Sequence, residues 1–318
     1  MTALLDIRDL SVRFRQGRQS VYALDQVSIS VGRSERVAIV GESGSGKTVS
    51  SIAAMRLLPP TAEITSGAIS FDGEDLASAS EAQMSAIRGR RMAMVFQNAP
   101  HSLNPLLTVG RQIADVHLRH NGGSREQAWA AAVAALEATG IPDAANRANL
   151  YAYEYSGGMA QRAMIAMALT CRPDLLIADE PTSGLDVTIQ LQVLDLIRAV
   201  ADETGAALML ITHEIGQIAG LCSRVVVMYA GRVFEDGPAD LVLSSPANPY
   251  TAALLDCAEP GDGDFPFIPG RAPDLRQRPS GCPFAPRCVK ARDRCRADRP
   301  EPRSHAGRLV ACHFPEAP

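Results

Sequence analysis

The octapeptide Gly41-Glu42-Ser43-Gly44-Ser45-Gly46-Lys47-Thr48 decides the fold class of this 318-residue chain. It fits the pattern G-x-x-x-x-G-K-[ST], in which glycines let successive backbone N–H groups turn toward phosphate oxygens. The lysine of this pattern supplies a cation to the β- and γ-phosphates, and the hydroxyl residue after it offers an oxygen to Mg²⁺. A chance match in a chain of this length has a probability of roughly 1%. The octapeptide therefore predicts a nucleotide-binding loop.

Short apolar runs alternate with helical patterns on both sides of this loop. The run at residues 36–40 directly precedes it and is typical of a strand buried on both faces. A helix is expected over residues 46–58, because Pro59 and Pro60 would end it. Further strands are expected at residues 4–12, 27–31, 175–178, 207–211 and 224–228. This alternation predicts an α/β fold, with a helical insertion that contains the Ala-rich stretch 125–139.

Composition excludes several classes of protein. Apolar residues make up 46% and charged residues 21%, so the chain is neither disordered throughout nor a collagen-like or coiled-coil fibre. No apolar run approaches the ~18 residues of a membrane span, and the acidic start of the chain does not fit a signal peptide. We therefore expect a cytoplasmic chain whose thiols stay reduced.

The formal charge of −4 hides two oppositely charged segments. Residues 271–318 hold 11 basic and 5 acidic side chains, a net charge of +6, and the first 270 residues carry −10. Pro, Gly, Arg and Asp dominate after about residue 258. We predict a main domain over residues 1–259 with a helical subdomain at about 98–170, a linker over 260–280, and a Cys-rich domain over 281–318. This last domain has too few apolar residues to fold by hydrophobic burial alone.

Two further elements carry candidate chemistry. An apolar run precedes Asp179 and Glu180, and we expect it to form a strand that brings both carboxylates to the ligand-binding edge of an open sheet. Asp179 is a candidate ligand of Mg²⁺, and Glu180 is a candidate general base for an attacking water. Ser156 is a suitable N-cap for a helix at about 159–170. That helix start is either an anion site for the nucleotide of another subunit or a plain capped end.

In order and spacing, these motifs resemble those of ABC transporter ATPase subunits over nearly the whole chain. Besides the octapeptide, which matches Walker A, the resemblance rests on the Q-loop Gln97, the signature Ser156-Gly157-Gly158, Asp179 and Glu180 of Walker B, the D-loop Ser183-Gly184-Leu185-Asp186 and the switch His213. It implies an ABC-type P-loop ATPase with a RecA-like core, an antiparallel β subdomain and a helical signature subdomain. It also implies an ATP-driven dimer, in which each nucleotide lies between Walker A of one chain and the signature of the other.

The resemblance implies a role for each motif residue. Catalytic roles fall on Glu180, His213 and Gln97, with His213 hydrogen-bonded to the γ-phosphate. The implied Mg²⁺ site comprises Thr48, Gln97 and Asp179. We expect Phe14 to stack on adenine, with Tyr22 as the alternative. The implied nucleotide contacts are Phe14, Gly41, Ser43, Gly44, Ser45, Gly46, Lys47, Thr48, Val49, Ser156, Gly157, Gly158 and Asp186.

A closer resemblance is to the D-type ATPase chains of oligopeptide/dipeptide (Opp/Dpp) importers. It rests on the octapeptide, on residues 97–105 (QNAPHSLNP) and on residues 163–169 (AMIAMAL). It implies peptide import at the cytoplasmic face of the inner membrane, with a second ATPase subunit (identical or different), two transmembrane permease subunits and an extracytoplasmic solute-binding protein. Ala160, Gly184 and Glu214 replace the usual Arg, Ala and Asp of the subfamily. None of these departures removes a required group, so we expect a competent ATP site.

Other functions stay open at this point. The same ATPase role could serve nickel or another non-peptide solute, or the chain could be a soluble ABC ATPase that acts on nucleic acid. The long coiled-coil insertion or second cassette usual in that last class is absent, and the net charge does not indicate nucleic-acid binding, so we expect no nucleic-acid partner. The signature and His213 disfavour a phosphate-loop kinase or GTPase.

Four of the seven cysteines, Cys282, Cys288, Cys295 and Cys312, fall within 31 residues. Zinc sites usually contain Cys pairs two to four residues apart, which are lacking here, although His305 and His313 could complete such a site. Disulfides are disfavoured in a reducing compartment, whereas Cys₄ iron–sulfur sites tolerate wider spacings. The segment also resembles the Opp/Dpp C-terminal extension, in which some members carry a [4Fe–4S] cluster. We therefore predict such a cluster, whose negative charge the interleaved cations would offset, with zinc or no metal as alternatives.

Overall fold

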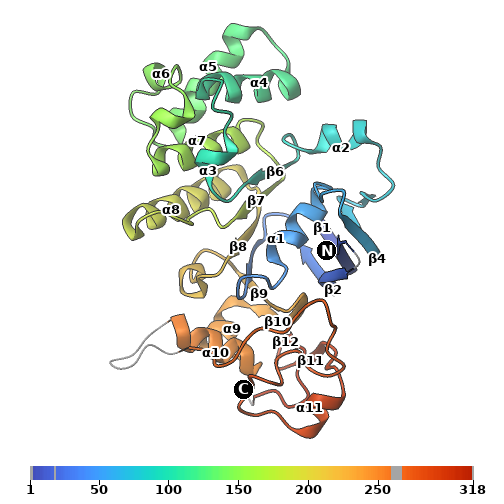
Figure 1. The fold of residues 1–318 in the computed structure, drawn as a ribbon. Coiled ribbons are helices and arrows are strands. Elements are labelled where there is room, and N and C mark those ends of the chain that lie inside the picture. Colours follow the sequence, from blue (N-terminus) through green and yellow to red (C-terminus); the bar gives the residue numbers. More distant parts are fainter. Residues whose placement is uncertain (1–2, 18, 259–266, 317–318) are drawn as a thin grey trace. The chain divides into compact units, whose positions relative to one another are not determined.

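The computed structural model describes residues 3–17, 19–258 and 267–316. The chain forms two compact units (Figure 1). The first unit comprises the chain up to Ser78 and from Leu210 onward, and the second comprises Ala79–Met209. The predicted α/β class is confirmed, because each unit combines helices with strands.

One sheet of the first unit is antiparallel and has the strand order β2-β1-β4-β5. Its strands are β1 (Leu5–Gln16), β2 (Gln19–Val31), β4 (Ala62–Phe71) and β5 (Glu74–Asp75). Apolar side chains of β1 and β2, such as Ile7 and Val27, are fully buried, as the alternation of the sequence predicts. This sheet carries Phe14 and Tyr22, which pair with Val21 and Arg13 respectively in the β1–β2 ladder.

A second set of strands leads into the phosphate-binding octapeptide. β3 (Arg36–Val40) pairs in parallel with β9 (Arg224–Tyr229), and Val37 through Val40 are fully buried. β9 in turn pairs antiparallel with β10 (Arg232–Pro238). Helix α1 (Lys47–Ala54) is shorter than the predicted 46–58, because Arg56 adopts a left-handed φ of 50° that ends the helix ahead of the prolines. The remaining short elements nearby are η2 (Ile215–Ile218), α9 (Ala239–Ser244) and α10 (Pro249–Ala258).

The second unit joins a parallel strand pair to a group of helices. β6 (Met92–Val95) and β7 (Leu175–Asp179) pair in parallel and are buried throughout. The helices are α2 (Glu81–Ile87), α3 (Ala99–Ser102), α4 (Val109–Asn121), α5 (Arg125–Ala138), α6 (Ala144–Arg147), η1 (Ala152–Glu154), α7 (Gly157–Leu169) and α8 (Val187–Thr204). β8 (Ala207–Thr212) follows α8 and contains the boundary with the first unit.

Local sequence signals explain the predicted Ala-rich helix, which α5 confirms. Ser124 accepts from the backbone N–H of Gln127, and the Gln127 side chain accepts from the backbone N–H of Ser124, so a capping box starts the helix. The buried face of α5 carries Ala128, Ala132 and Leu136. The predicted helical subdomain at about 98–170 is part of a larger unit, because β6, β7 and α8 belong to it as well. Within the described residues, no helix has both the length and the apolar character that a bilayer span requires.

The Cys-rich segment contains α11 (Asp293–Ala297), β11 (Arg303–His305) and β12 (Arg308–Val310). β12 pairs with β10, with Val310 opposite Glu235, so the segment adds strands to a sheet of the first unit. The sequence predicts a Cys-rich domain over residues 281–318, and the described residues of this range belong to the first compact unit. Of the predicted linker over 260–280, residues up to 266 lie outside the described residues. Its later part contacts β2, where the Tyr22 N–H donates to the Leu275 carbonyl at 3.0 Å.

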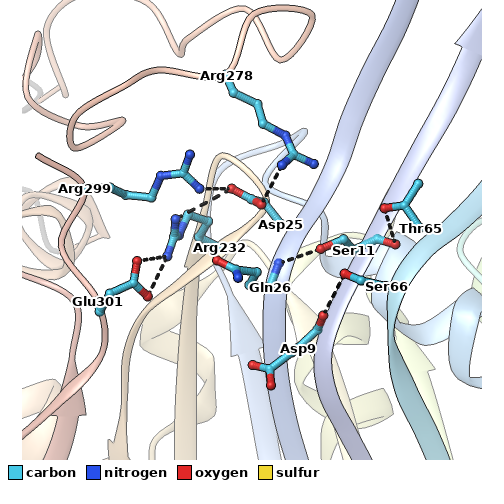
Figure 2. Close-up of polar contacts among 10 residues, drawn as sticks. All are labelled: Asp9, Ser11, Asp25, Gln26, Thr65, Ser66, Arg232, Arg278, Arg299 and Glu301. Carbon is cyan, nitrogen blue, oxygen red and sulfur yellow. Dashed lines mark hydrogen bonds and ion pairs between the residues drawn. The ribbon is translucent and has the colours of Figure 1, made fainter.

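Arginines of the C-terminal segment also pair with carboxylates of the first unit. The carboxylate of Asp25, which is only 7% exposed, forms ion pairs with Arg278 and Arg299 of this segment and with Arg232 of β10 (Figure 2). Arg308 pairs with Glu235 at 3.2 Å, and both of these side chains are almost fully buried. Glu235 also accepts from two backbone N–H groups, those of Ala247 and Asn248. Strand pairing and buried ion pairs therefore compensate for the small apolar content of this segment.

The Arg308–Glu235 pair provides a test of this attachment. Arg308→Ala should lower the free energy of unfolding by about 3 kcal/mol, because it leaves the buried Glu235 carboxylate without its cation. Urea denaturation followed by circular dichroism measures this loss. Arg303→Ala is the matched control, since Arg303 is exposed on β11. A loss no larger than that of the control would show that the pair does not stabilise the fold.

Candidate functional site

The octapeptide forms the turn between β3 and α1 and has the backbone shape of a phosphate cradle. Gly41 has a φ of 149°, and a Cβ there would lie 2.1 Å from the Met228 carbonyl oxygen. Gly46 has a φ of 102°, and its Cβ would lie 2.7 Å from the Ala23 carbonyl oxygen. Only glycine fits at these two positions, because the neighbouring atoms belong to the backbone and cannot move aside. The glycines that the sequence motif contains at these two positions are therefore required for steric reasons in the structure.

Polar groups of the loop match a phosphate ligand. The Lys47 ammonium donates to the carbonyl oxygens of Gly41 and Glu42 at 2.7 and 3.1 Å, which holds it against the loop. The buried Ser45 hydroxyl has no hydrogen-bond partner among the described residues. The N-cap of α1 is Gly46, which has no side chain to accept from the first N–H groups of the helix. These donors fit the anionic phosphates of a nucleotide.

In the second unit, β7 carries Asp179 and Glu180 to its C-terminal end. Asp179 is 2% exposed, and Glu180 has a φ of 45°, an uncommon conformation for a residue with a side chain. The Gln97 side-chain amide donates to the Glu180 carboxylate at 2.9 Å and lies 3.4 Å from the Ser183 hydroxyl. The structure thus brings the predicted Gln97 and Glu180 together. It adds Ser183, for which the D-loop motif was the only signal in the sequence.

The signature residues lie beside the D-loop within the same unit. Ser156 accepts from the Met159 N–H at 3.3 Å and caps α7, as predicted. Asp186 caps α8 in the same way by accepting from the Ile189 N–H at 3.0 Å. A Cβ on Gly158 would lie 2.9 Å from the Ile189 side chain, so the two helix starts are closely packed. Signature, D-loop and Q-loop residues line one cavity of about 410 Å³: Gln97, Asn98, Ala99, Pro100, Gly157, Gln161, Ser183, Gly184 and Leu185.

The predicted site residues are divided between the two units. Phe14, the octapeptide with Val49, His213 and the four clustered cysteines belong to the first unit, and Gln97, the signature, Asp179, Glu180 and Asp186 belong to the second. His213 directly follows β8, and its side chain is 48% exposed. Its Nε2 atom lies 3.9 Å from the Glu214 carboxylate.

The two candidates for adenine stacking have different surroundings. Phe14 lies on β1 between Val21 and Ala62 of the neighbouring strands and is half-buried. The Arg278 guanidinium lies over the Tyr22 ring, 4.0 Å from its centroid. One face of Tyr22 is therefore already covered by the C-terminal segment.

The four clustered cysteines line a single cavity of about 20 Å³ together with apolar side chains such as Phe284 and Phe314. Burial raises the pKa of the Cys282 thiol to about 11 and also raises the pKa of Cys288 and Cys312. Among the described residues, however, no three His, Cys, Asp or Glu side chains form a group that could hold a metal ion.

The sequence suggested that His305 and His313 could bind zinc and that the cations of this segment could offset the charge of a cluster. In the structure these side chains contact carbonyl groups, carboxylates and an aromatic ring. The ring nitrogens of His305 and His313 lie at hydrogen-bond distance from the carbonyls of Glu316 and Asp298. Several of the cations interleaved with the cysteines pair with carboxylates: Arg287 with Glu42, Lys290 with Glu316, Arg294 with Asp298 and Arg296 with Asp293. Arg292 lies over the Phe314 ring at 4.2 Å. No motif in the sequence pointed to the Arg287–Glu42 pair.

Two family profiles match the chain. The profile described as ABC transporter matches residues 24–183, and the profile described as oligopeptide/dipeptide transporter, C-terminal region, matches residues 234–295. The dipeptide transport ATP-binding protein DppD of Escherichia coli is 44% identical over 317 residues, which covers 98% of this chain and 97% of that protein. The oligopeptide transport ATP-binding protein OppD of Haemophilus influenzae is 42% identical and covers 93% of this chain and 92% of that protein.

Solved structures show the same type of fold. The ATP-binding cassette MJ0796, a dimer in a post-hydrolysis state bound to ADP and Pi, superimposes with a TM-score of 0.66 and 26% identity. The alignment covers 74% of this chain and 98% of that cassette. CbiO1 of Clostridium perfringens, part of an ABC transporter complex, superimposes with a TM-score of 0.64 over 77% of this chain and 92% of its own; at 24% identity it bears on the fold alone.

The steric argument at Gly41 gives a test of the phosphate cradle. Gly41→Ala should weaken ATP binding by at least about tenfold, because the added Cβ forces the loop away from the Met228 carbonyl. Equilibrium binding of a fluorescent ATP analogue measures the change. Gly216→Ala is the control, since a Cβ there meets open space. Equal affinity in the Gly41 variant and the wild type would refute this placement of the loop.

Proposed function

Because the chain belongs to the ABC transporter ATP-binding proteins, we propose that it is the ATP-hydrolysing subunit that powers an importer of di- or oligopeptides. The observation that carries this proposal is the 44% identity to a dipeptide transport ATP-binding protein over 98% of the chain. The match to the oligopeptide/dipeptide C-terminal region extends the similarity beyond the ATPase motifs. Since ABC transporter ATP-binding proteins are ATPases, ATP hydrolysis is the activity of this chain.

The residues of the phosphate loop bind ATP in this proposal. Backbone N–H groups of the loop and the Lys47 ammonium hold the β- and γ-phosphates. The Thr48 hydroxyl and the Asp179 carboxylate are suitable ligands for Mg²⁺, and Gln97 offers a further oxygen. When bound, Mg²⁺ neutralises charge on the phosphates and supplies Lewis-acid chemistry. Phe14 is our choice for the adenine-stacking residue, because Arg278 covers one face of Tyr22.

Glu180 and His213 prepare the attack of water on the γ-phosphate. The Glu180 carboxylate accepts a proton from that water, and its hydrogen bond with Gln97 orients the carboxylate. His213 donates a hydrogen bond to the γ-phosphate and so helps to hold the reacting groups in line. In a dimer, Ser156, the two signature glycines and Asp186 face the nucleotide of the other ATPase subunit. The dimeric state of the MJ0796 cassette supports this arrangement.

The partners of the chain follow from its class. Peptides must cross the membrane through other polypeptides, so we expect two transmembrane permease subunits and a second ATPase subunit, identical or different. An extracytoplasmic solute-binding protein would deliver the peptide. The chain itself would then be peripheral, at the cytoplasmic face of the inner membrane, and would have no nucleic-acid partner.

Transport by the reconstituted complex tests this function. Proteoliposomes that contain the permeases, both ATPase subunits and the solute-binding protein should take up labelled di- or oligopeptide only with ATP. Uptake of a nickel complex but not of peptides would contradict the proposed cargo. ATPase stimulation by nucleic acid, without association with permeases, would contradict the transporter role itself.

Glu180→Gln should lower the ATP hydrolysis rate about 100-fold or more, because glutamine cannot accept the proton of the attacking water. ATP affinity should stay within about twofold of the wild type, since the phosphate loop is unchanged. Phosphate release and equilibrium nucleotide binding measure the two quantities. Glu203→Gln is the matched control, as Glu203 is an exposed residue of α8. Hydrolysis at the wild-type rate by the Glu180 variant would exclude Glu180 as the base.

We also propose that the four clustered cysteines of the C-terminal segment bind a [4Fe–4S] cluster. Four thiols around one cavity match the ligand number of a Cys₄ cluster. Cys282, Cys288, Cys295 and Cys312 would be the ligands, and the role would be structural. Because burial raises the pKa of the Cys282, Cys288 and Cys312 thiols, loading would release protons and would weaken as the pH falls.

Metal analysis of protein purified without oxygen tests the cluster. We expect about four iron atoms per chain and a broad visible absorbance, both of which Cys288→Ser should lower. Cys171→Ser is the matched control, because Cys171 belongs to the second unit. Stoichiometric zinc without iron, or protein free of both metals, would overturn the proposal.

A further inference from the structure

Glu42, the second residue of the phosphate loop, is held by an arginine of the C-terminal segment. Arg287 donates through Nη1 to Glu42 Oε2 at 2.7 Å and through Nη2 to Glu42 Oε1 at 2.9 Å. This two-pronged geometry is the strong form of an arginine–carboxylate pair. The Arg287 side chain is 6% exposed and the Glu42 side chain 27%. The pair is therefore better shielded than the exposed ion pairs that contribute little.

The guanidinium of Arg287 is fixed in a single orientation. Nη1 also donates to the Tyr229 hydroxyl at 3.1 Å, Nη2 to the Ile268 carbonyl at 3.1 Å and Nε to the Pro269 carbonyl at 2.9 Å. With the two bonds to Glu42, these contacts equal the five N–H donors of an arginine. The hydrogen bonds to Glu42 raise the pKa of Arg287 well above its ordinary value, so it stays charged. The surrounding groups thus provide a hydrogen-bond acceptor for every N–H group of this guanidinium.

The backbone of Glu42 has a second anchor. Its N–H donates to the Tyr250 hydroxyl at 2.9 Å, and Tyr250 is fully buried against Tyr229 with ring centroids 4.6 Å apart. The Glu42 carbonyl accepts from the Lys47 ammonium at 3.1 Å. Glu42 therefore connects Arg287 and Tyr250 to the lysine of the phosphate loop.

We propose that Arg287 is a positioning residue for ATP binding, which acts through Glu42 to keep the phosphate loop in its nucleotide-binding conformation. The loop is rich in glycine and has many alternative backbone conformations once the clamp is lost. The apparent nucleotide affinity then falls by the fraction of chains that still hold the competent loop. This inference rests on ATP binding at the loop and is independent of the transported solute.

Steady-state kinetics separate positioning from a merely structural role. Arg287→Met should raise the KM for ATP and the Kd of a fluorescent ATP analogue about tenfold, with kcat at saturating ATP changed less than twofold. This split is expected because bound phosphates restore the loop before hydrolysis. Arg287→Lys should give an intermediate KM, since an ammonium keeps the charge but cannot bind both carboxylate oxygens. Arg294→Ala is the matched control, because Arg294 is an exposed arginine of the same segment.

Variants on the loop side keep the test decisive if Arg287→Met fails to fold. Glu42→Gln removes the ion pair with little change in size, and Tyr250→Phe removes only the hydroxyl that holds the Glu42 N–H. Both should raise the KM for ATP. The inference is overturned if folded Arg287→Met, or these two variants together, bind ATP as tightly as the wild type. A wild-type chain that does not bind ATP would instead refute the function proposed above.

Discussion

Buried pairing between arginines of the C-terminal segment and carboxylates of the first unit is the interaction on which the attachment of that segment depends. Arg278 and Arg299 reach Asp25, Arg287 reaches Glu42, and Arg308 reaches Glu235. The carboxylates of Asp25 and Glu235 are buried, and a buried carboxylate without its cation is strongly unfavourable, so the pairs at these two acids hold the segment in one register. The net charges of +6 and −10 on the two parts of the sequence therefore correspond to ion pairs between these parts in the structure. The basic segment is not only a solvated face or a counter-charge for a cluster, because its arginines neutralise named acids elsewhere in the unit.

Features that depend on local chemistry could be predicted from the sequence. The apolar run at β3, the Ala-rich α5 and the Ser156 cap of α7 each follow from periodicity, propensity or capping within a few residues. The glycines of the phosphate loop were predictable for the same reason, since their left-handed or crowded backbone leaves no alternative. Element ends were less predictable. Helix α1 ends at Ala54 and not at Leu58, because the left-handed Arg56 ends it before the prolines do.

Features that depend on pairing between distant residues could not be predicted in this way. Arg287 and Glu42 lie 245 positions apart, and neither residue type carries a pattern that identifies the other. The contact between Gln97 and Glu180, 83 positions apart, was within reach only because both belong to ordered family motifs. The attachment of the C-terminal segment to the first unit is a further example. The composition changes after residue 258, yet the pairing of β12 with β10 joins the segment to the first unit. No pattern in the sequence of either strand identifies the other strand as its partner.

These distant contacts also connect the cysteine cavity to the nucleotide loop. Arg287 and Cys288 are consecutive, and both of their N–H groups donate to the Phe284 carbonyl. The Phe284 ring lines the cysteine cavity and packs edge-on against Tyr250, whose hydroxyl accepts from Glu42. Arg287 and Tyr250, the two groups that hold Glu42, therefore both contact Phe284, which lines the cavity of the four thiols. The packing around the four cysteines is thus continuous, through one aromatic ring and a few hydrogen bonds, with the contacts that hold the phosphate loop.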